Sequence, residues 1–185
     1  MGANRFVLHG ENVLWSDAER IAHLPLAATA SGKTAEAQIL VEGKGPEAPS
    51  VWLLAGDELW WFDGAGKLSR KPLAGGRAKL IAEEGAAPRS FTLHERTLYW
   101  TVAGKNEVRA LSLDPASGSV SGPRTLAADV CPEGAARSIE AKLYLECPGS
   151  PERHGELFEL PSDGGAPRPL LQTDQPGSFT YMRQL

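Results

Sequence analysis

A segment of ten residues that occurs four times constrains the fold more than any other feature of this sequence. The copies align without gaps and share their apolar and polar columns: FVLHGENVLW at 6–15, WLLAGDELWW at 52–61, FTLHERTLYW at 91–100 and ARSIEAKLYL at 136–145. Each copy has two short runs of alternating apolar and polar residues around a polar or glycine-containing pair, which is typical of a β-hairpin. The repeat period is roughly 43 residues, measured at the last column of the alignment: Trp15, Trp61, Trp100 and Leu145.

Each hairpin is followed by two further short runs with strand character. The third runs lie at 21–26, 68–73, 108–113 and 157–160, and the fourth runs at 38–41, 79–82, 124–127 and 169–172. Four short strands in a unit of this length are typical of one blade of a β-propeller. We therefore expect an all-β fold, a β-propeller with four blades of four antiparallel strands, in a single domain over 1–185. The expected repeats are 5–48, 49–86, 87–133 and 134–175.

The last residues add about one strand to the four complete units. The segment SFTYM at 178–182 matches SFTL at 90–93, so a spare terminal strand is expected within 176–185. Two alternatives remain open: a closed four-bladed ring that uses this strand at its seam, or part of a larger propeller. The abrupt ends favour the second alternative slightly, in which open blade edges would allow self-association.

The hairpin ends resemble the repeat of YWTD-type propellers, the low-density-lipoprotein-receptor class B-like family and its bacterial relatives. The similar segments are LWSD at 14–17, WWFD at 60–63, YWTV at 99–102 and YLEC at 144–147. In that family the repeat is structural. The resemblance implies that the aromatic anchors Trp15, Trp61 and Trp100 pack between blades. It also implies that Asp17 and Asp63 accept backbone hydrogen bonds at strand ends. Val102 and Cys147 depart from the aspartate position, and the usual six blades are not all present.

The two cysteines, Cys131 and Cys147, fall near opposite positions of the fourth hairpin. Around the turn at 140–141, two residues lie opposite each other when their residue numbers sum to about 281. The residue numbers of the two cysteines come close to this sum. A disulfide would close a loop whose cross-link contributes on the order of 3 kcal/mol, and it would imply an oxidising compartment. The alternative is two free, half-buried thiols. An extracytoplasmic location is therefore favoured only if the disulfide forms, and a cytoplasmic one otherwise.

Charge and hydropathy exclude two classes of partner. Nineteen basic and 23 acidic residues are interspersed, giving a formal net charge of −4 without a basic patch. This argues against nucleic acid and anionic membrane surfaces. No apolar run approaches the roughly 18 residues of a membrane span, and the first residues lack the apolar core of a signal peptide.

No catalytic, cofactor-binding or metal-binding set stands out. His9 and His94 share one column before the hairpin turn, where we expect strand-end histidines near solvent. The segment 29–34 ends like a phosphate-binding loop but lacks its first glycine, and Val120 stands where a nucleophile elbow has serine. The ligands of a Ca²⁺ site on a propeller axis would come from several blades, so they would form no motif that one sequence could reveal. We therefore expect no cofactor, with Ca²⁺ as an alternative.

Two aromatic residues, Trp52 and Trp60, lie outside the anchor column. They predict either an aromatic interaction patch or packing between blades. With no concentrated catalytic set, the sequence favours a binding scaffold for a protein, peptide or glycan. The alternative is a propeller enzyme with a channel site, of the metal-dependent lactonase or lyase type.

Overall fold

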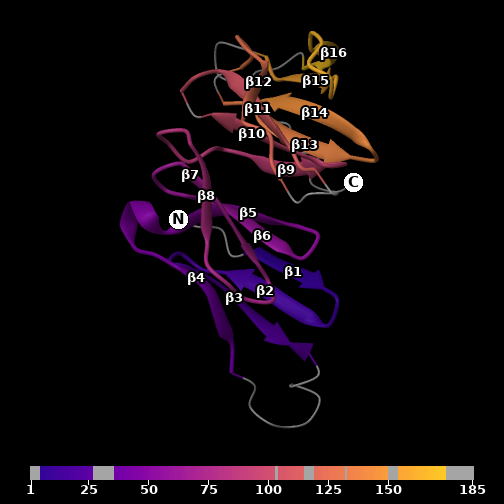
Figure 1. Cartoon of the computed structure of the whole chain (residues 1–185). Helices are drawn as coiled ribbons and strands as arrows, with labels where there is room; N and C mark the ends of the chain where they lie inside the picture. The colour runs from indigo at the N-terminus through magenta and orange to yellow at the C-terminus, as the bar shows by residue number, and fades with distance from the viewer. Residues whose placement is uncertain are drawn as a thin grey trace. The chain divides into compact units, whose positions relative to one another are not determined.

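The computed structural model describes residues 5–26, 36–102, 104–114, 119–131, 133–149 and 154–173, and in this part of the chain it is all-β. Sixteen strands form four antiparallel sheets of four strands each (Figure 1). Within every sheet the strands follow one another in chain order, so each sheet is a meander of the kind that makes up a propeller blade. None of the described helical turns is long and apolar enough to cross a membrane.

The first two sheets lie in the first half of the chain. The first contains β1 (Arg5–His9), β2 (Asn12–Ser16), β3 (Arg20–Pro25) and β4 (Gln38–Glu42). A short 3-10 turn, η1 (Gly45–Glu47), leads to the second sheet. That sheet contains β5 (Pro49–Ala55), β6 (Glu58–Asp63), β7 (Lys67–Pro72) and β8 (Lys79–Glu83).

The other two sheets repeat this plan in the second half of the chain. The third contains β9 (Phe91–His94), β10 (Thr97–Val102), β11 (Glu107–Ser112) and β12 (Arg124–Ala127). The fourth contains β13 (Ala135–Ile139), β14 (Lys142–Cys147), β15 (Glu156–Leu160) and β16 (Arg168–Gln172). Each sheet lies within one of the four expected repeats.

The register of the hairpins follows the columns of the sequence repeat. In every sheet the first column of the repeat pairs with the last: Phe6 with Trp15, Trp52 with Trp61, Phe91 with Trp100 and Ala136 with Leu145. Directly opposed residues share one face of an antiparallel pair. The repeat therefore specifies which side chains each sheet presents together.

A register shift occurs at the same place in all four sheets, between the third and fourth strands. It falls directly after the first apolar residue of the third run: Ile21, Leu68, Val108 and Leu157. A bulge of this kind bends a strand and increases its local twist. The outermost strand of each sheet therefore departs from simple alternation at an equivalent position.

The chain divides into two compact units, Met1–Ala87 and Pro88–Leu185, each containing two sheets. The core of the first unit joins its two sheets through Leu14, Ile21, Leu59 and Trp61, among others. The core of the second unit joins its sheets through Tyr99, Val108, Leu143, Leu145 and their neighbours.

Two features singled out in the sequence fall outside the described residues. These are the spare terminal strand at 176–185 and the segment 29–34, which ends like a phosphate-binding loop.

Candidate functional site

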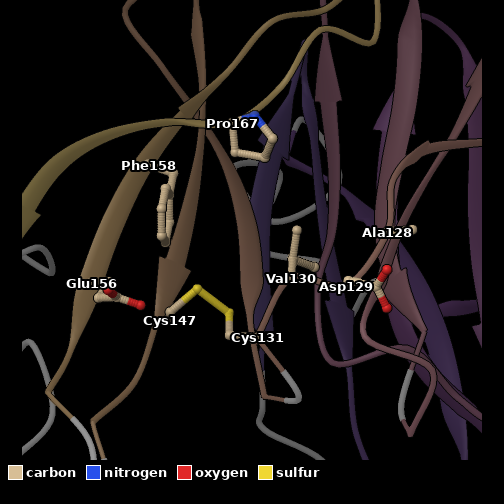
Figure 2. Close-up of a pocket in the computed structure, with 8 residues that line it drawn as sticks. All are labelled: Ala128, Asp129, Val130, Cys131, Cys147, Glu156, Phe158 and Pro167. Carbon is tan, nitrogen blue, oxygen red and sulfur yellow. A yellow bond between two sulfur atoms is a disulfide. The ribbon is translucent and has the colours of Figure 1, made fainter.

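A pocket of about 380 Å³ opens at the edge of the core of the second unit, beside the disulfide (Figure 2). One part of its wall comes from the connection after β12, and the other from the fourth sheet. The lining residues are Ala128, Asp129, Val130, Cys131, Cys147, Glu156, Phe158 and Pro167. Its volume lies at the low end of the range of small-molecule pockets.

The connection after β12 forms one part of the pocket wall, and its backbone conformation and hydrogen bonding fix its position. Asp129 has a left-handed backbone with φ of 52°, a conformation that aspartate tolerates better than most residues. The next residue, Val130, donates its N–H to the carbonyl of Asn106 at 3.1 Å. The Asp129 carboxylate is therefore carried by a turn that is fixed to the β10–β11 connection.

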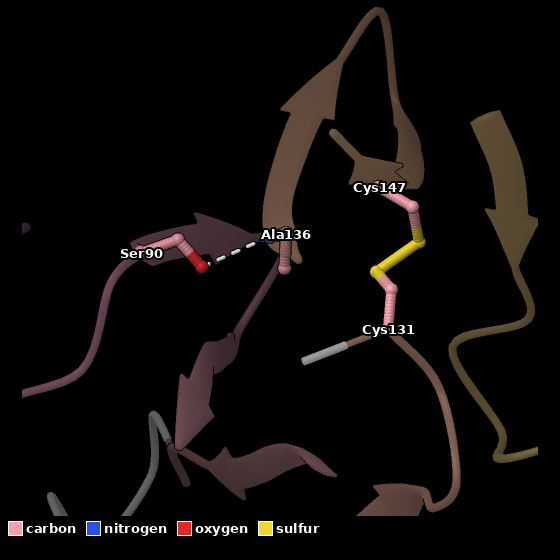
Figure 3. Close-up of a disulfide and its surroundings, with 4 residues drawn as sticks. All are labelled: Ser90, Cys131, Ala136 and Cys147. Carbon is pink, nitrogen blue, oxygen red and sulfur yellow. Dashed lines mark hydrogen bonds between the residues drawn. A yellow bond between two sulfur atoms is a disulfide. The ribbon is translucent and has the colours of Figure 1, made fainter. Parts of the chain in front are cut away.

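A disulfide joins this connection to the last residue of β14. Cys131 and Cys147 are bonded, with 5.6 Å between their Cα atoms (Figure 3). Gly134 permits the close approach, because a Cβ atom there would lie 2.6 Å from the Cys131 sulfur. Nearby, Ser90 Oγ accepts the N–H of Ala136 at 2.9 Å and so ties β13 to the residue that directly precedes β9. The two cysteines, the one pair named from the sequence, thus form part of the pocket wall.

The pocket combines an apolar wall with two carboxylates. Val130, Phe158, Pro167 and the disulfide supply apolar surface, while Asp129 and Glu156 are the only ionisable groups among the described residues that line it. Within the described chain neither carboxylate forms an ion pair or a hydrogen bond. A cavity of this composition suits a side chain that has an aliphatic stem and a cationic end.

The histidines do not converge on a common site. His9 Nε2 lies 3.1 Å from Asp57 Oδ1, and His94 Nδ1 lies 2.9 Å from Ser138 Oγ, so each contacts the following hairpin of its own unit. The prediction that His94 lies near solvent was wrong, because it is buried with 6% of its surface exposed. Among the described residues, no group of three histidine, cysteine, aspartate or glutamate side chains could hold a metal ion.

The anchor residues of the repeat occupy different environments. Trp61 and Trp100 are buried, whereas Trp15 is half-buried on the face of the first sheet that points away from the second. Asp63 Oδ1 accepts the N–H of Lys67 at 2.8 Å, and Asp17 Oδ1 accepts the N–H groups of residues 19 and 20 at 3.0 Å. Asp63 is the last residue of β6 and Asp17 directly follows β2, so both aspartates accept backbone hydrogen bonds at a strand end.

Trp52 and Trp60 are buried, so they form packing rather than a surface patch. The guanidinium of Arg5 stacks 5.3 Å from the ring centre of Trp52, and that of Arg70 stacks 5.4 Å from Trp60. Both indole N–H groups are buried without a hydrogen-bond partner in the described structure. The choice that the sequence left open between patch and packing is thereby decided for packing.

Comparison with known proteins shows the fold. No family model and no curated protein matches this sequence. Solved structures do match: a luciferin-regenerating enzyme (TM-score 0.63, 14% identity, 94% of this chain and 62% of that one) and a nidogen/laminin complex (0.60, 21%, 90% and 63%). A third is a putative 6-phosphogluconolactonase from Bacteroides fragilis NCTC 9343 (0.58, 15%, 95% and 55%).

These similarities confirm the predicted class, an all-β β-propeller with blades of four antiparallel strands. At such low identity they show the fold alone. The chain spans about half to two thirds of the length of these three structures.

Proposed function

We propose that this chain is a polypeptide-binding propeller module of the YWTD type, and that its pocket beside the disulfide holds a basic side chain of the partner. The observation that carries the proposal is a pocket whose apolar wall is lined by two unpartnered carboxylates, Asp129 and Glu156, on opposite sides of the disulfide (Figure 2). A lysine or arginine would place its methylene stem against Phe158 and its charge at the carboxylates.

Two further observations support a binding role of this type. Asp17 and Asp63 accept backbone hydrogen bonds in the manner that the YWTD resemblance implies. One structural neighbour is a complex of two proteins, nidogen and laminin. A partner polypeptide is therefore the ligand class that we propose, in preference to a glycan.

A pair of fluorescein-labelled peptides tests the charge preference of the pocket. The peptides Gly-Ser-Leu-Arg-Leu-Ser-Gly and Gly-Ser-Leu-Gln-Leu-Ser-Gly differ only in the central side chain. We expect the arginine peptide to bind at least about tenfold more tightly in an anisotropy titration, because a charge-assisted hydrogen bond is lost in the other. Added salt should weaken the preference, since the pocket is open to solvent.

Matched carboxylate variants locate the effect. Glu156→Gln should remove most of the difference between the two peptides, whereas Glu83→Gln, at an exposed position of β8, should leave it unchanged. Equal binding of both peptides by the wild-type chain would contradict the proposal. The same holds for a preference that Glu156→Gln leaves intact.

A further inference from the structure

The first sheet has one packed face and one open face. Its packed face contributes Leu14, Ile21 and Leu40 to the core of the first unit. The strand register places six alternating apolar side chains on the other face: Phe6, Leu8, Val13, Trp15, Leu24 and Ile39. Phe6 and Leu8 have 70% and 72% of their surface exposed, and Ile39 has 43%. An open face of this composition is unusual for a monomeric protein.

The sequence repeat identifies this face as one that packs on another sheet. In the second sheet the anchor Trp61 packs against Leu14 and Ile21 of the first sheet. In the fourth sheet the equivalent Leu145 packs against Val108 of the third. Trp15 holds the same column in the first sheet, and no described sheet precedes it. The face therefore has the composition of a contact between sheets but lacks a partner within the described chain.

The size and margin of this face suit a small, concentration-dependent interface. Four strands of five to six residues, about 4.8 Å apart and rising about 3.3 Å per residue, give a footprint of roughly 300 Å², which is less than the roughly 800 Å² per partner of a tight complex. The ion pair between Asp17 and Arg20 lies at one end of the strands, at 2.6 Å. An apolar centre with a polar margin is the arrangement found in protein interfaces.

The outward face of the fourth sheet has the opposite character. This face is the one opposite to the buried side chains of Leu143 and Leu145. It presents the ion pairs Arg137–Glu146 at 2.8 Å and Lys142–Glu159 at 3.5 Å, and Arg168 is also paired with Glu159. A head-to-tail contact of two chains would cover these charges with an apolar sheet, at a desolvation cost. Two copies of the first sheet's open face avoid this cost, because both surfaces are apolar and uncharged at the centre.

We propose that two copies of this chain form a twofold-symmetric dimer through the open face of β1–β4, each presenting Phe6, Leu8 and Trp15 to the other. Such a contact is isologous, and two sheets pack face to face as in a β-sandwich. The dimer is independent of the pocket, which lies in the second unit.

The test is the solution mass of the full chain by light scattering during size exclusion, over a series of micromolar concentrations. We expect a dimer of twice the 19.8 kDa chain mass. Phe6→Lys combined with Leu8→Lys should weaken the dimer at least about tenfold, because these are the most exposed large apolar side chains of the face and the variant would bury two unpaired charges in the contact. Phe6→Gln with Leu8→Gln serves as a second, uncharged pair should the lysines impair folding, which circular dichroism monitors.

Leu171→Lys is the matched control, because Leu171 is 53% exposed and lies on the outward face of the fourth sheet. This variant should remain dimeric. A monomer at every concentration would overturn the proposal, and so would a dimer that survives both double variants. Loss of the dimer in Leu171→Lys would also overturn it, because that result indicates a head-to-tail contact.

Discussion

Gly134 shows how a single residue shapes the pocket wall. A Cβ atom there would meet the Cys131 sulfur at 2.6 Å and Leu145 Cδ1 at 2.9 Å. Because the sulfur is held in a disulfide, it cannot move aside as the end of a flexible side chain would. The glycine at this position is therefore required by space rather than by backbone conformation.

Gly134→Ala should accordingly destabilise the fold by roughly 1–3 kcal/mol, the usual cost of overpacking a core. Urea unfolding of the variant and the wild type measures the difference. Gly122→Ala is the control, since a Cβ atom at Gly122 would meet nothing within 4 Å. Equal stability of the Gly134 variant and the wild type would show that the wall is more adaptable than its distances indicate.

Asp17 is a second residue with a measurable consequence. A hydrogen bond from the Arg20 side chain, followed by one from the backbone N–H of Glu19, holds the pKa of the Asp17 carboxyl below its usual value. A carboxyl whose pKa is lowered by folding stabilises the fold above its unfolded pKa of about 3.9. That contribution disappears as the pH falls through the folded pKa.

We therefore expect Asp17→Asn to be slightly less stable than the wild type near neutral pH and to match it in strong acid. The effect should be small because the pair is solvent-exposed and screened. Urea unfolding at pH values above and well below about 3.9 measures the gap between the two proteins. A gap of constant size across this range would show that the Asp17 charge is not its origin.

At the scale of elements, the β13–β14 turn uses residues that fit it poorly. Glu140 and Ala141 form the two-residue connection, and both have positive φ, at 47° and 60°. Turns with two left-handed residues favour asparagine and glycine, because a Cβ atom is strained in this region. The equivalent turns of the first two sheets begin with Gly10 and Gly56, which carry no such strain.

Ala141→Gly should therefore stabilise the chain by about 1 kcal/mol, because left-handed strain in a non-glycine residue is relieved. Thermal unfolding followed by circular dichroism checks this. Ala18→Gly, at an exposed turn without positive φ, should instead leave stability unchanged or lower it slightly. Destabilisation of both variants alike would contradict the role assigned to the Ala141 backbone.

The strands and hairpin registers could be predicted because they depend on the alternation of apolar and polar residues, with a period of two, within a short segment of the chain. Trp52 and Trp61 pair as their columns indicate. The same arithmetic places Cys131 and Cys147 near opposite positions and leaves a disulfide and two free thiols as alternatives, of which the structure contains the disulfide. The pocket could not be predicted in this way. Its carboxylates, Asp129 and Glu156, come from a connection and from a strand of another sheet, and whether both line one pocket depends on the path between β12 and β13. No periodic pattern encodes that path.

The open face of the first sheet could not be predicted from the sequence for a similar reason. Alternation alone places Phe6 and Trp15 on one face, but it does not reveal that this face remains uncovered. The bulge after Ile21 adds to the difficulty, because Leu40 and Val41 both contact the packed core despite being adjacent.

For the whole molecule, the sheets at the two ends of the repeat series have outward faces of opposite character. The first sheet presents an uncovered apolar face, and the fourth presents a network of ion pairs around Glu159. The pocket lies on the inner side of the fourth sheet, at the edge of its core with the third. Ligand binding at the pocket and self-association at the first sheet therefore concern different sheets and can be measured separately.

The most direct test of the proposed function is to locate the bound arginine peptide by two-dimensional NMR of the isotope-labelled chain. We expect saturable shifts of backbone amides around the pocket, at Asp129, Cys131, Cys147, Glu156 and Phe158, and much smaller shifts with the glutamine peptide. Shifts confined to the first unit, or the absence of saturable shifts with the arginine peptide, would contradict a binding site beside the disulfide.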